Sequence, residues 1–396
     1  MKLGVYGGTY NPPHLGHLTA ARAAMEQLGL DKLLVVPAAV PPHKDIPIGS
    51  PTARQRLDMA VLGFADIWQR VTVTDMELCR GGKSFTSDTL RALRDQYPED
   101  ELYLLMGTDM FLTLESWHEP TAVMELAHLG VFARERGDDL TAQKKHLEEA
   151  YGARITLIRN PAVVEVSSSQ IRRDPAAYAD KLAPPVWGYM EREGLYDLAV
   201  DLRHLTPAQL QPIALSYLKP KRMPHVLGTA EEAARLARRF GEDETAARVA
   251  GLLHDCTKKL DMAEQKTLCA QYGIVLDELE QTALKLLHAK TGAAIARQVY
   301  GVSDAVYEAI LYHTTGRAGM SRLEKILYLA DYIEPSRDFA GDPDVVRLRE
   351  TVYQDLDRGM LLGLTMTIRE MEELGSPVHH DTLDARCDLI NKGVTI

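Results

Sequence analysis

The pattern of apolar residues changes near residue 200, and this change limits the chain to folds with two different halves. From Lys2 to about Asp197, short apolar runs such as KLGVYG, LLVVPAA and ELYLLMG alternate with amphipathic stretches such as TAARAAMEQLGL. This alternation predicts a parallel β-sheet with helices on both faces. Beyond Leu205, nearly every segment has the periodicity of an amphipathic helix. We therefore expect an α/β, Rossmann-like domain followed by an all-α domain.

The length of the chain also favours two domains, because a single core usually stops growing near roughly 250–300 residues and this chain has 396. The crossover segment LRHLTPAQLQPIALSYLKPKRMPH is rich in proline and contains a short basic cluster, which is typical of a join between domains. The predicted boundaries are 1–197 for the first domain, 198–220 for a linker and 221–396 for the second domain. Because the join looks separable, we expect the two halves to act independently.

Composition narrows the class of protein. A formal net charge of -11 argues against a protein that coats nucleic acid or an anionic membrane. The chain contains no apolar run long enough to span a bilayer, and MKLGVYGGTYNPPH is typical of a strand and glycine turn rather than a signal peptide, so a cytoplasmic protein is expected. The sequence leaves open whether it forms a homo-oligomer. Four cysteines without paired-ligand spacing predict reduced, buried thiols at Cys79, Cys256, Cys269 and Cys387.

A glycine turn near the N-terminus predicts a phosphate site. Gly7 and Gly8 follow the first expected strand, and the run NPPHLGH leads into a helix, which is a layout that binds phosphate. His14 and His17 are three residues apart, so at a helix start they share one face and can reach the same polyanion. Gly16 is expected to let that polyanion approach the backbone. A glycine pair alone also makes ordinary turns, but the HxGH pattern strengthens the phosphate interpretation.

The run GGTYNPPHLGH resembles the signature of the HxGH nucleotidyltransferase superfamily, and residues 1–197 are similar to its bacterial nicotinate-nucleotide adenylyltransferases. Supporting segments are Pro42-His43-Lys44, Ser84-Phe-Thr86, Gly107-Thr108-Asp109, Trp117, Arg134 and Ser167-Ser-Ser-Gln-Ile-Arg172. Pantetheine-phosphate adenylyltransferases share HxGH, but the longer domain, SFTSDTL and Trp117 favour the pyridine-nucleotide branch. The prediction of nicotinate rather than nicotinamide mononucleotide as the substrate rests on the resemblance alone.

The resemblance implies attack of a nicotinate mononucleotide phosphate oxygen on the α-phosphorus of ATP, with pyrophosphate leaving. The attacking phosphate is already ionised, so no base is required. Charge neutralisation is assigned to His14, His17, Lys44, Arg172 and Mg²⁺. The implied substrate-binding residues are Gly7, Gly8, Thr9, Thr86, Gly107, Asp109, Trp117, Arg134, Ser168 and Ser169, with Trp117 stacked on the pyridine ring. Trp117 could instead be a packed core indole, Asp109 a helix N-cap and His43 a solvated loop tip.

The second half contains histidines and aspartates that together suit a metal centre. They are His225, His254, Asp255, His288, His313 and Asp331. Neutral imidazoles with carboxylates suit iron, manganese, cobalt, magnesium or zinc. The His254-Asp255 pair ends the apolar run VAGLL, where a charge needs a partner and a metal is the simplest one. Taken singly, each histidine is more often an ordinary core or surface residue.

This set, with HDCTK at 254–258, YHTTGR at 312–317 and LEKILYLADYIEPSRDF at 323–339, resembles the HD-domain superfamily. Residues 206–396 are similar to its YqeK-type bacterial symmetrical diadenosine-tetraphosphate hydrolases. The resemblance implies that His225, His254, Asp255 and Asp331 hold one metal and that Asp255, His288 and His313 hold a second, with Asp255 bridging. The expected metals are iron, manganese or cobalt.

The same resemblance implies a hydrolase. Two metals ~3.5–4 Å apart activate a water and brace the phosphoryl oxygens, while Lys258, Arg317 and Arg222 neutralise phosphate charge. The central bridge of diadenosine tetraphosphate then breaks to give two ADP. Cys256 points about 100° away from Asp255 and is expected to pack, and Arg337 with Asp338 is expected to form a surface pair. The alternatives are another nucleotide phosphohydrolase or a nucleotide sensor without turnover.

Overall fold

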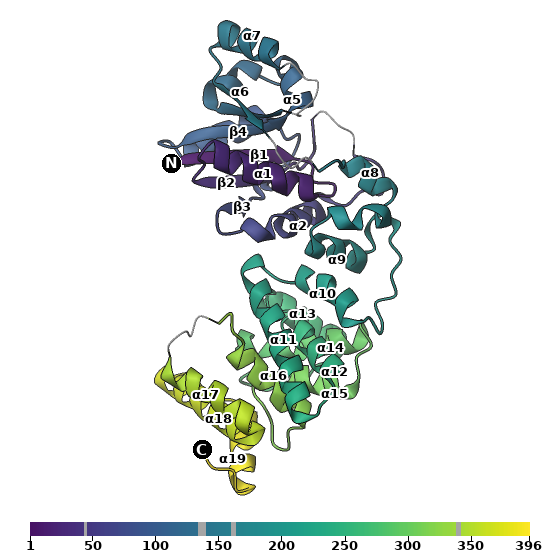
Figure 1. Ribbon diagram of the computed structural model, residues 1–396, viewed down its shortest axis with the longest axis vertical. Coiled ribbons are helices and arrows are strands. Elements are labelled where there is room, and N and C mark those ends of the chain that lie inside the picture. Colours follow the sequence, from purple (N-terminus) through teal and green to yellow (C-terminus); the bar gives the residue numbers. More distant parts are fainter. Residues whose placement is uncertain (43–45, 134–139, 160–163, 338–341) are drawn as a thin grey trace. The chain divides into compact units, whose positions relative to one another are not determined.

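The computed structural model describes residues 1–42, 46–133, 140–159, 164–337 and 342–396. The chain divides into two compact units, Met1–Ala199 and Val200–Ile396. Every described strand lies in the first unit, coloured purple to teal in Figure 1, and the described residues of the second unit form only helices and connecting segments. The predicted fold class, an α/β Rossmann-like domain followed by an all-α domain, is therefore confirmed.

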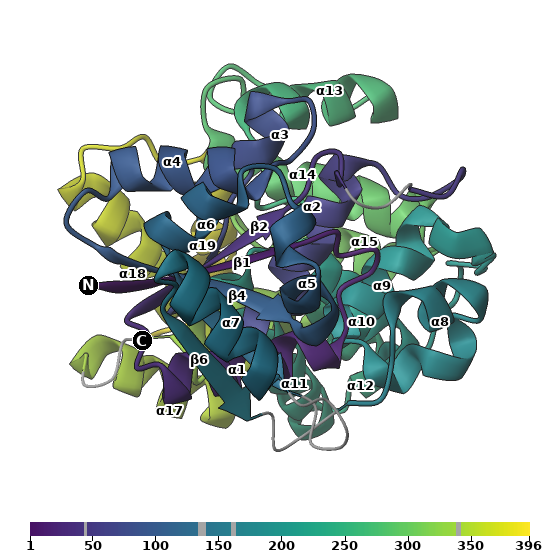
Figure 2. The same cartoon turned by 90° about the horizontal axis from the view of Figure 1, so that it is seen from above.

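The first unit contains a six-stranded sheet in which all described pairs are parallel, in the order β3-β2-β1-β4-β5-β6. The strands are β1 (Lys2–Gly8), β2 (Lys32–Pro37), β3 (Val71–Val73), β4 (Glu101–Gly107), β5 (His128–Ala133) and β6 (Ile155–Arg159). Figure 2 shows β1 between β2 and β4. Because the strand order reverses between β1 and β4, a crevice opens beyond their carboxyl ends, where ligands bind in folds of this kind.

Helices cover both faces of this sheet, which explains why its strands are continuously apolar rather than alternating. Leu34 and Val36 of β2 join one core cluster, whereas Leu33 and Val35 join the other. One face is covered by α1 (Leu15–Gln27) and α2 (Ala53–Gly63), which contribute to the cluster that contains Leu33 and Val35. The opposite face is covered by α4 (Thr86–Gln96), α5 (Thr108–Leu112), α6 (Pro120–Leu126) and α7 (Thr141–Tyr151). Shorter helices α3 (Met76–Arg80), α8 (Ser168–Arg173) and α9 (Pro184–Glu193) complete the unit.

The second unit is built around one apolar core to which most of its helices contribute. The helices are α10 (Pro207–Ser216), α11 (Met223–Phe240), α12 (Glu244–Leu253), α13 (Met262–Tyr272), α14 (Leu284–Gln298), α15 (Asp304–Leu311), α16 (Arg322–Ile333), α17 (Pro343–Gln354), α18 (Leu356–Glu373) and α19 (His380–Asn391). Alanines line much of the contact between α11 and α12, including Ala230, Ala233, Ala237, Ala247 and Ala250. Small side chains let helix backbones approach closely, so the ends of these two helices can bring polar residues together.

The predicted linker over 198–220 requires correction. Residues 207–216 form α10, and Leu210, Ile213 and Ala214 are buried in the core of the second unit. Thr206 caps this helix by accepting a hydrogen bond from Gln209 N at 3.4 Å, and Pro207 occupies the first helical turn, where its missing N–H costs nothing. Pro207, Pro220 and Pro224, which suggested a linker, therefore lie in the first turns of helical segments, and Pro212 lies within α10. The boundary between the two units falls at 199/200.

Two further sequence expectations concern membranes and thiols. Among the described residues, no helix combines the length and apolar character needed to cross a bilayer. All four cysteines are free thiols, as expected. Cys256 and Cys269 are buried, but Cys79 and Cys387 are exposed, so the expectation of burial was wrong for these two.

Candidate active site and metal centre

The glycine turn after β1 leads directly into α1, with His14 as the residue that precedes the helix. The main-chain N–H of His14 donates to Nδ1 of His17 at 3.2 Å, so the His17 ring caps the helix start. A Cβ on Gly16 would lie 2.9 Å from the His14 ring. Gly16 is therefore required by the placement of His14, a different reason from the approach of a polyanion that the sequence suggested.

The two histidines are neutral in the ligand-free protein. Burial lowers the pKa of His14 to about 4, and burial together with the neighbouring His14 lowers the pKa of His17 well below its ordinary value. Because Nδ1 of His17 accepts a hydrogen bond, its ring proton lies on Nε2, which is left to donate. His14 Nδ1 is buried without a hydrogen-bond partner. The pair therefore offers hydrogen-bond donors to an anion without carrying a prior charge.

Helix α8 docks onto the same turn from the far end of the unit. Arg172 donates to the main-chain oxygen of Asn11 at 2.8 Å and to Ser169 Oγ at 3.0 Å. Ser168 Oγ donates to the main-chain oxygen of Pro12 at 2.9 Å. Contacts across more than 150 residues thus bring Arg172 to the turn that precedes His14.

A cavity of about 520 Å³ lies at the carboxyl ends of β1 and β4. The predicted residues that line it are Gly7, Gly8, Thr9, His14, His17, Thr86, Gly107, Trp117, Ser168, Ser169 and Arg172. Trp117 also packs against the core, so the interpretation as a packed core indole holds in part, and stacking on the pyridine ring stays a prediction. Asp109 is exposed in the first turn of α5 and lines no part of this cavity, and the N-cap of α5 is Gly107, so the N-cap alternative for Asp109 was wrong. Lys44, His43 and Arg134 lie outside the described residues.

Sequence reasoning missed Arg56, a fully buried residue of α2. Its guanidinium donates to the main-chain oxygens of Thr9 at 2.8 Å and Ala39 at 2.9 Å, which ties the phosphate turn to the end of β2. Tyr196 was also missed, and its hydroxyl donates to Asn11 Oδ1 at 2.7 Å. The signal for Arg56 was its position on the apolar face of the helix, one residue before Leu57 and four before Ala60.

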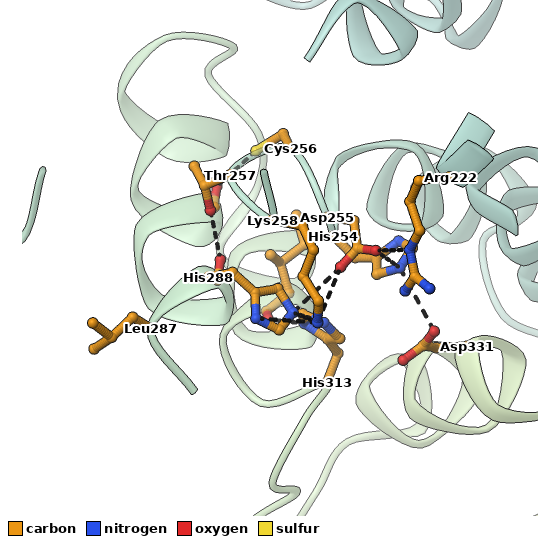
Figure 3. Close-up of polar contacts among 12 residues, drawn as sticks. Arg222, His254, Asp255, Cys256, Thr257, Lys258, Leu287, His288, His313 and Asp331 are labelled. Atoms are coloured by element: carbon orange, nitrogen blue, oxygen red, sulfur yellow. Dashed lines mark hydrogen bonds and ion pairs between the residues drawn. The ribbon is translucent and has the colours of Figure 1, made fainter. Parts of the chain in front are cut away.

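The predicted metal ligands converge in the second unit from five places in the sequence. His225 lies in the first turn of α11, His254 and Asp255 follow α12, His288 lies in α14, His313 follows α15 and Asp331 lies in α16. Figure 3 shows the labelled members pointing toward one another. The approach of α11 and α12 depends on Gly251, where a Cβ would lie 2.5 Å from Cα of Ala230.

Distances within this cluster are those of groups that can share metal ions. Asp331 Oδ1 lies 2.9 Å from His225 Nε2 and 3.7 Å from His254 Nε2. On the other side, Asp255 Oδ1 lies 3.3 Å from His288 Nε2, and the Nε2 atoms of His288 and His313 are 3.2 Å apart. Two groups have ligand atoms within 4.8 Å of one another: His225, His254 and Asp331 form one, and His254, Asp255 and His313 form the other.

Hydrogen bonds behind the rings set which nitrogen is free. Nδ1 of His254 donates to the main-chain oxygen of Gly251, and Nδ1 of His313 donates to that of Ile310, both at 2.7 Å. A carbonyl only accepts, so each Nδ1 holds the proton and each Nε2 keeps its lone pair. His254 Nε2 and Asp255 Oδ1 are buried without a hydrogen-bond partner. Orphaned buried acceptors facing one another fit a cation, and neutral imidazole with carboxylate is a donor set for divalent metals.

Electrostatics keep the donors in the form that binds metal. Burial lowers the pKa of His254, His288 and His313, which keeps their rings neutral. Burial alone would raise the pKa of Asp255, but the neighbouring His254 and His288 hold it well below its usual value, so the carboxylate stays ionised. His225 differs, because its hydrogen bonds to Asp331 and Glu334 outweigh the lowering effect of burial and raise its pKa.

Three cationic side chains border the cluster. Arg222 Nε donates to Asp255 Oδ2 at 2.6 Å, and Arg337 donates to Asp331 Oδ1 at 2.8 Å. Lys258 Nζ lies 2.9 Å from His288 Nε2. Arg337 therefore contacts a predicted metal ligand. Its predicted surface pair with Asp338 stays a prediction, because Asp338 lies outside the described residues.

Arg317 is placed differently from the other predicted cations. Its guanidinium donates to Glu324 at 2.6 Å and to Glu308 at 3.1 Å, and it lies over the ring of Tyr312. Two carboxylates already balance its charge, so Arg222 is better placed than Arg317 to meet a phosphate. Cys256 is buried with Sγ directed toward the main-chain oxygen of Gly292, in agreement with its expected packing role.

A further cluster of Asp277, His379 and His380 does not offer the same chemistry. His379 caps α19, with Nδ1 accepting from the N–H of Asp381 at 3.2 Å. Its Nε2 must then hold the proton, which faces Asp277 Oδ2 at 3.1 Å. A neutral imidazole in this arrangement has no free lone pair for a metal, so we assign no metal to this group.

Two family models match the chain. Residues 5–174 match the cytidylyltransferase-like family, and residues 222–336 match the HD domain. The fold and the two sites thus define a nucleotidyltransferase unit joined to an HD domain, in agreement with both resemblances seen in the sequence.

A probable nicotinate-nucleotide adenylyltransferase of Exiguobacterium sibiricum is 38% identical over 173 residues, which cover 44% of this chain and 85% of the relative. One of Idiomarina loihiensis is 33% identical over 208 residues, which cover 48% of this chain and 98% of the relative. Through its first unit, the chain belongs to the nicotinate-nucleotide adenylyltransferase family.

Two solved structures are also similar to parts of the chain. A predicted HD superfamily hydrolase involved in NAD metabolism from Clostridium acetobutylicum is 39% identical, with 48% of this chain and 98% of that chain covered and a TM-score of 0.45. Plasmodium falciparum nicotinic acid mononucleotide adenylyltransferase complexed with APC is 17% identical. The match covers 50% of this chain and 98% of that chain, with a TM-score of 0.42.

Proposed function

We propose that the chain is a bifunctional enzyme, with an adenylyltransferase site in the first unit and a metal-dependent phosphohydrolase site in the second. The observation that supports the first activity best is the convergence of His14, His17 and Arg172 on the cavity at the switch point of the sheet. The observation that supports the second is the cluster of imidazole Nε2 atoms and carboxylate oxygens in which His254 Nε2 and Asp255 Oδ1 are buried without a hydrogen-bond partner.

In the first unit, the proposed reaction transfers the adenylyl group of ATP to nicotinate mononucleotide, giving deamido-NAD and pyrophosphate. The triphosphate lies along the turn between β1 and α1, where His17 Nε2–H and the guanidinium of Arg172 meet its oxygens. A phosphate oxygen of the mononucleotide forms a bond to the α-phosphorus as the bond to pyrophosphate breaks. Mg²⁺ bound with ATP would reduce the charge on the leaving oxygens.

Further residues of the cavity are assigned to the second substrate. Thr86 begins α4 and lines the cavity, which supports the proposal that its hydroxyl and the helix start bind the mononucleotide phosphate. Trp117 presents its indole to the same cavity, and we propose that it stacks on the pyridine ring. Lys44 remains a proposed phosphate contact, and Arg134 remains a proposed substrate-binding residue.

The test of this activity is formation of pyrophosphate and the dinucleotide from ATP with either nicotinate or nicotinamide mononucleotide. His14→Ala should reduce turnover at least about a hundredfold, since preorganised donors to a developing charge have effects of this size. His146→Ala, which changes an exposed histidine of α7, should leave turnover unchanged. Equal loss in both variants, or no dinucleotide from either mononucleotide, would refute the proposal.

In the second unit, the proposed reaction is symmetrical hydrolysis of diadenosine tetraphosphate to two ADP. We propose His225, His254, Asp255, His288, His313 and Asp331 as ligands of a centre of two iron, manganese or cobalt ions. Such ions would supply an activated water and brace the phosphoryl oxygens. Lys258 and Arg222 contact Asp255 and His288, which are proposed metal ligands. Because the metal ions would compete with these two cations for the ligand atoms, Lys258 and Arg222 would then contact phosphate oxygens instead.

The test is chromatography of the products formed from diadenosine tetraphosphate with manganese, iron or cobalt. ADP as the sole product would support the proposal if Asp255→Ala abolishes its formation and Asp304→Ala does not. Asp304 serves as the control because its carboxylate is exposed. ATP plus AMP would mean asymmetric cleavage. If a panel of nucleotides is hydrolysed but this one is not, the unit is a different nucleotide phosphohydrolase, and binding without turnover would identify a nucleotide sensor.

A further inference from the structure

The hydrogen-bond partner behind His225 differs from those behind His254 and His313. Those two rings donate from Nδ1 to main-chain carbonyls, Gly251 O and Ile310 O. His225 Nδ1 instead lies 2.9 Å from Oε1 of Glu334, a carboxylate. The difference matters because a charged acceptor behind an imidazole makes the opposite nitrogen a stronger donor to a metal.

Glu334 is held in place by its own surroundings. Its side chain is fully buried, and it follows directly after the last residue of α16, three residues beyond Asp331. The N–H of Ser336 donates to Glu334 Oε2 at 2.7 Å, and the Ser336 hydroxyl donates to Oε1 at 2.9 Å. The end of α16 thus provides Asp331 on the Nε2 side of the His225 ring and Glu334 on the Nδ1 side.

Space for this carboxylate comes from Gly228, which lies three residues after His225 and therefore on the same face of α11. A Cβ at Gly228 would lie 2.3 Å from Glu334 Oε2 and 3.1 Å from Cδ. Heavy atoms cannot approach so closely, so any other residue at 228 would force the carboxylate away from His225. The glycine and the glutamate form one arrangement across more than 100 residues of sequence.

We propose that Glu334 is a positioning residue for the metal ligand His225 and that Gly228 provides the room for it. Glu334 accepts the Nδ1 proton, which fixes the tautomer and rotation of the ring so that the Nε2 lone pair faces Asp331 and His254. Its negative charge also makes Nε2 a stronger electron donor. This inference rests on the proposed metal centre, although it does not depend on which nucleotide is hydrolysed.

The test compares metal affinity in the full chain, measured by competition with a chromogenic chelator for Co²⁺ and Mn²⁺ and by the visible spectrum of bound Co²⁺. Gly228→Ala and Glu334→Gln should each weaken binding by about 10–100-fold, the usual effect of losing a partner behind a ligand. Gly363→Ala is the matched control. Gly363 lies within helix α18, and a Cβ added there would have its nearest neighbour at an ordinary 3.4 Å. It should bind metal like the parent protein.

A double-mutant cycle separates positioning from a structural role. In a His225→Ala background, Glu334→Gln should cause little further loss of affinity, since the ring through which it acts is gone. If the variants lower the stability of the metal-free protein but leave metal affinity in the folded fraction unchanged, the inference is overturned. Glu334 would then only stabilise the contact between α11 and α16. If the Gly228→Ala variant does not fold, the metal affinity of Glu334→Gln alone tests the positioning role. A parent protein that binds no metal would overturn the proposed centre as well, whereas parent binding with unaffected variants would overturn the positioning role alone.

Discussion

Helices α11 and α12 meet at Gly251 and Ala230, where a Cβ on Gly251 would lie 2.5 Å from the Ala230 Cα. This contact brings the rings of His225 and His254 to a centroid separation of 5.5 Å. Gly251 also provides the carbonyl that holds the His254 ring. Gly251 therefore governs the spacing of two proposed metal ligands and orients one of them, His254.

Gly251→Ala should destabilise the second unit by about 1–3 kcal/mol, since overpacking a tight helix contact has effects of this size. Metal affinity should fall as well, because the added methyl separates the two ligand helices. Urea unfolding and chelator competition measure the two effects, with Gly363→Ala as a helical-glycine control. Unchanged stability and affinity would mean that the two helices can shift apart without disturbing the ligands.

Binding of ATP should be accompanied by uptake of a proton at His14. Burial lowers the pKa of His14 to about 4 in the free protein, and a bound triphosphate favours the protonated ring and so raises this pKa. Affinity should therefore increase as pH falls from 8 toward 6, by no more than about tenfold per unit for one proton. His14 rather than His17 takes up the proton, because Nδ1 of His17 already accepts a hydrogen bond.

Calorimetry in buffers of different ionisation enthalpy measures this proton uptake. His14→Gln, measured under the same conditions, removes the contribution of ATP's own titration. Equal proton uptake by the parent and variant proteins would show that His14 stays neutral in the complex.

Replacement of the buried Arg56 should affect both stability and ATP binding. Arg56→Met leaves the carbonyls of Thr9 and Ala39 without their donors, at a cost of about 1–3 kcal/mol for each buried group. The KM for ATP should rise, because Thr9 lines the cavity. Arg54→Met, two residues earlier in the same helix but exposed, should change stability by less than about 0.5 kcal/mol. Similar urea midpoints for both variants would contradict this role.

Removal of metal should destabilise the second unit selectively. Metal at 100 times its dissociation constant adds about 2.7 kcal/mol of stability, which corresponds to roughly 5–10 °C for a unit of this size. Calorimetry with and without EDTA should show a shift in one unfolding transition, and Asp255→Ala should abolish that shift. A shift of equal size in the variant would place the bound metal elsewhere.

The first unit should retain its activity when separated from the second. A fragment that ends at Ala199 keeps every described residue of the adenylyltransferase cavity, because all of them precede this boundary. Its kcat and KM should match those of the full chain within about twofold. A folded fragment with no adenylyl transfer would show that the units depend on each other.

Much of this molecule could be predicted from its sequence because the signals are local. The alternation of apolar runs, the glycine turn before HxGH and the histidine-aspartate pair at the end of an apolar helix all depend on neighbouring residues. The linker was misjudged for the same reason, since the prolines near residue 207 look like a break. Whether they end or begin a helix depends on the core against which Leu210 and Ile213 pack.

The sequence by itself determined the two fold classes, the chemical types of the site residues and their order along the chain. Only the tertiary structure decided which nitrogen of each histidine is free, that Arg56 clamps the phosphate turn and that Glu334 lies behind His225. Thr9 and Arg56 are 47 residues apart and His225 and Glu334 are 109 apart, whereas His254 and His313 are each held by a carbonyl three residues earlier. The distances of the long-range contacts depend on how closely helices and loops pack, as at Gly228 and Gly251, where the absence of a single Cβ permits the contact.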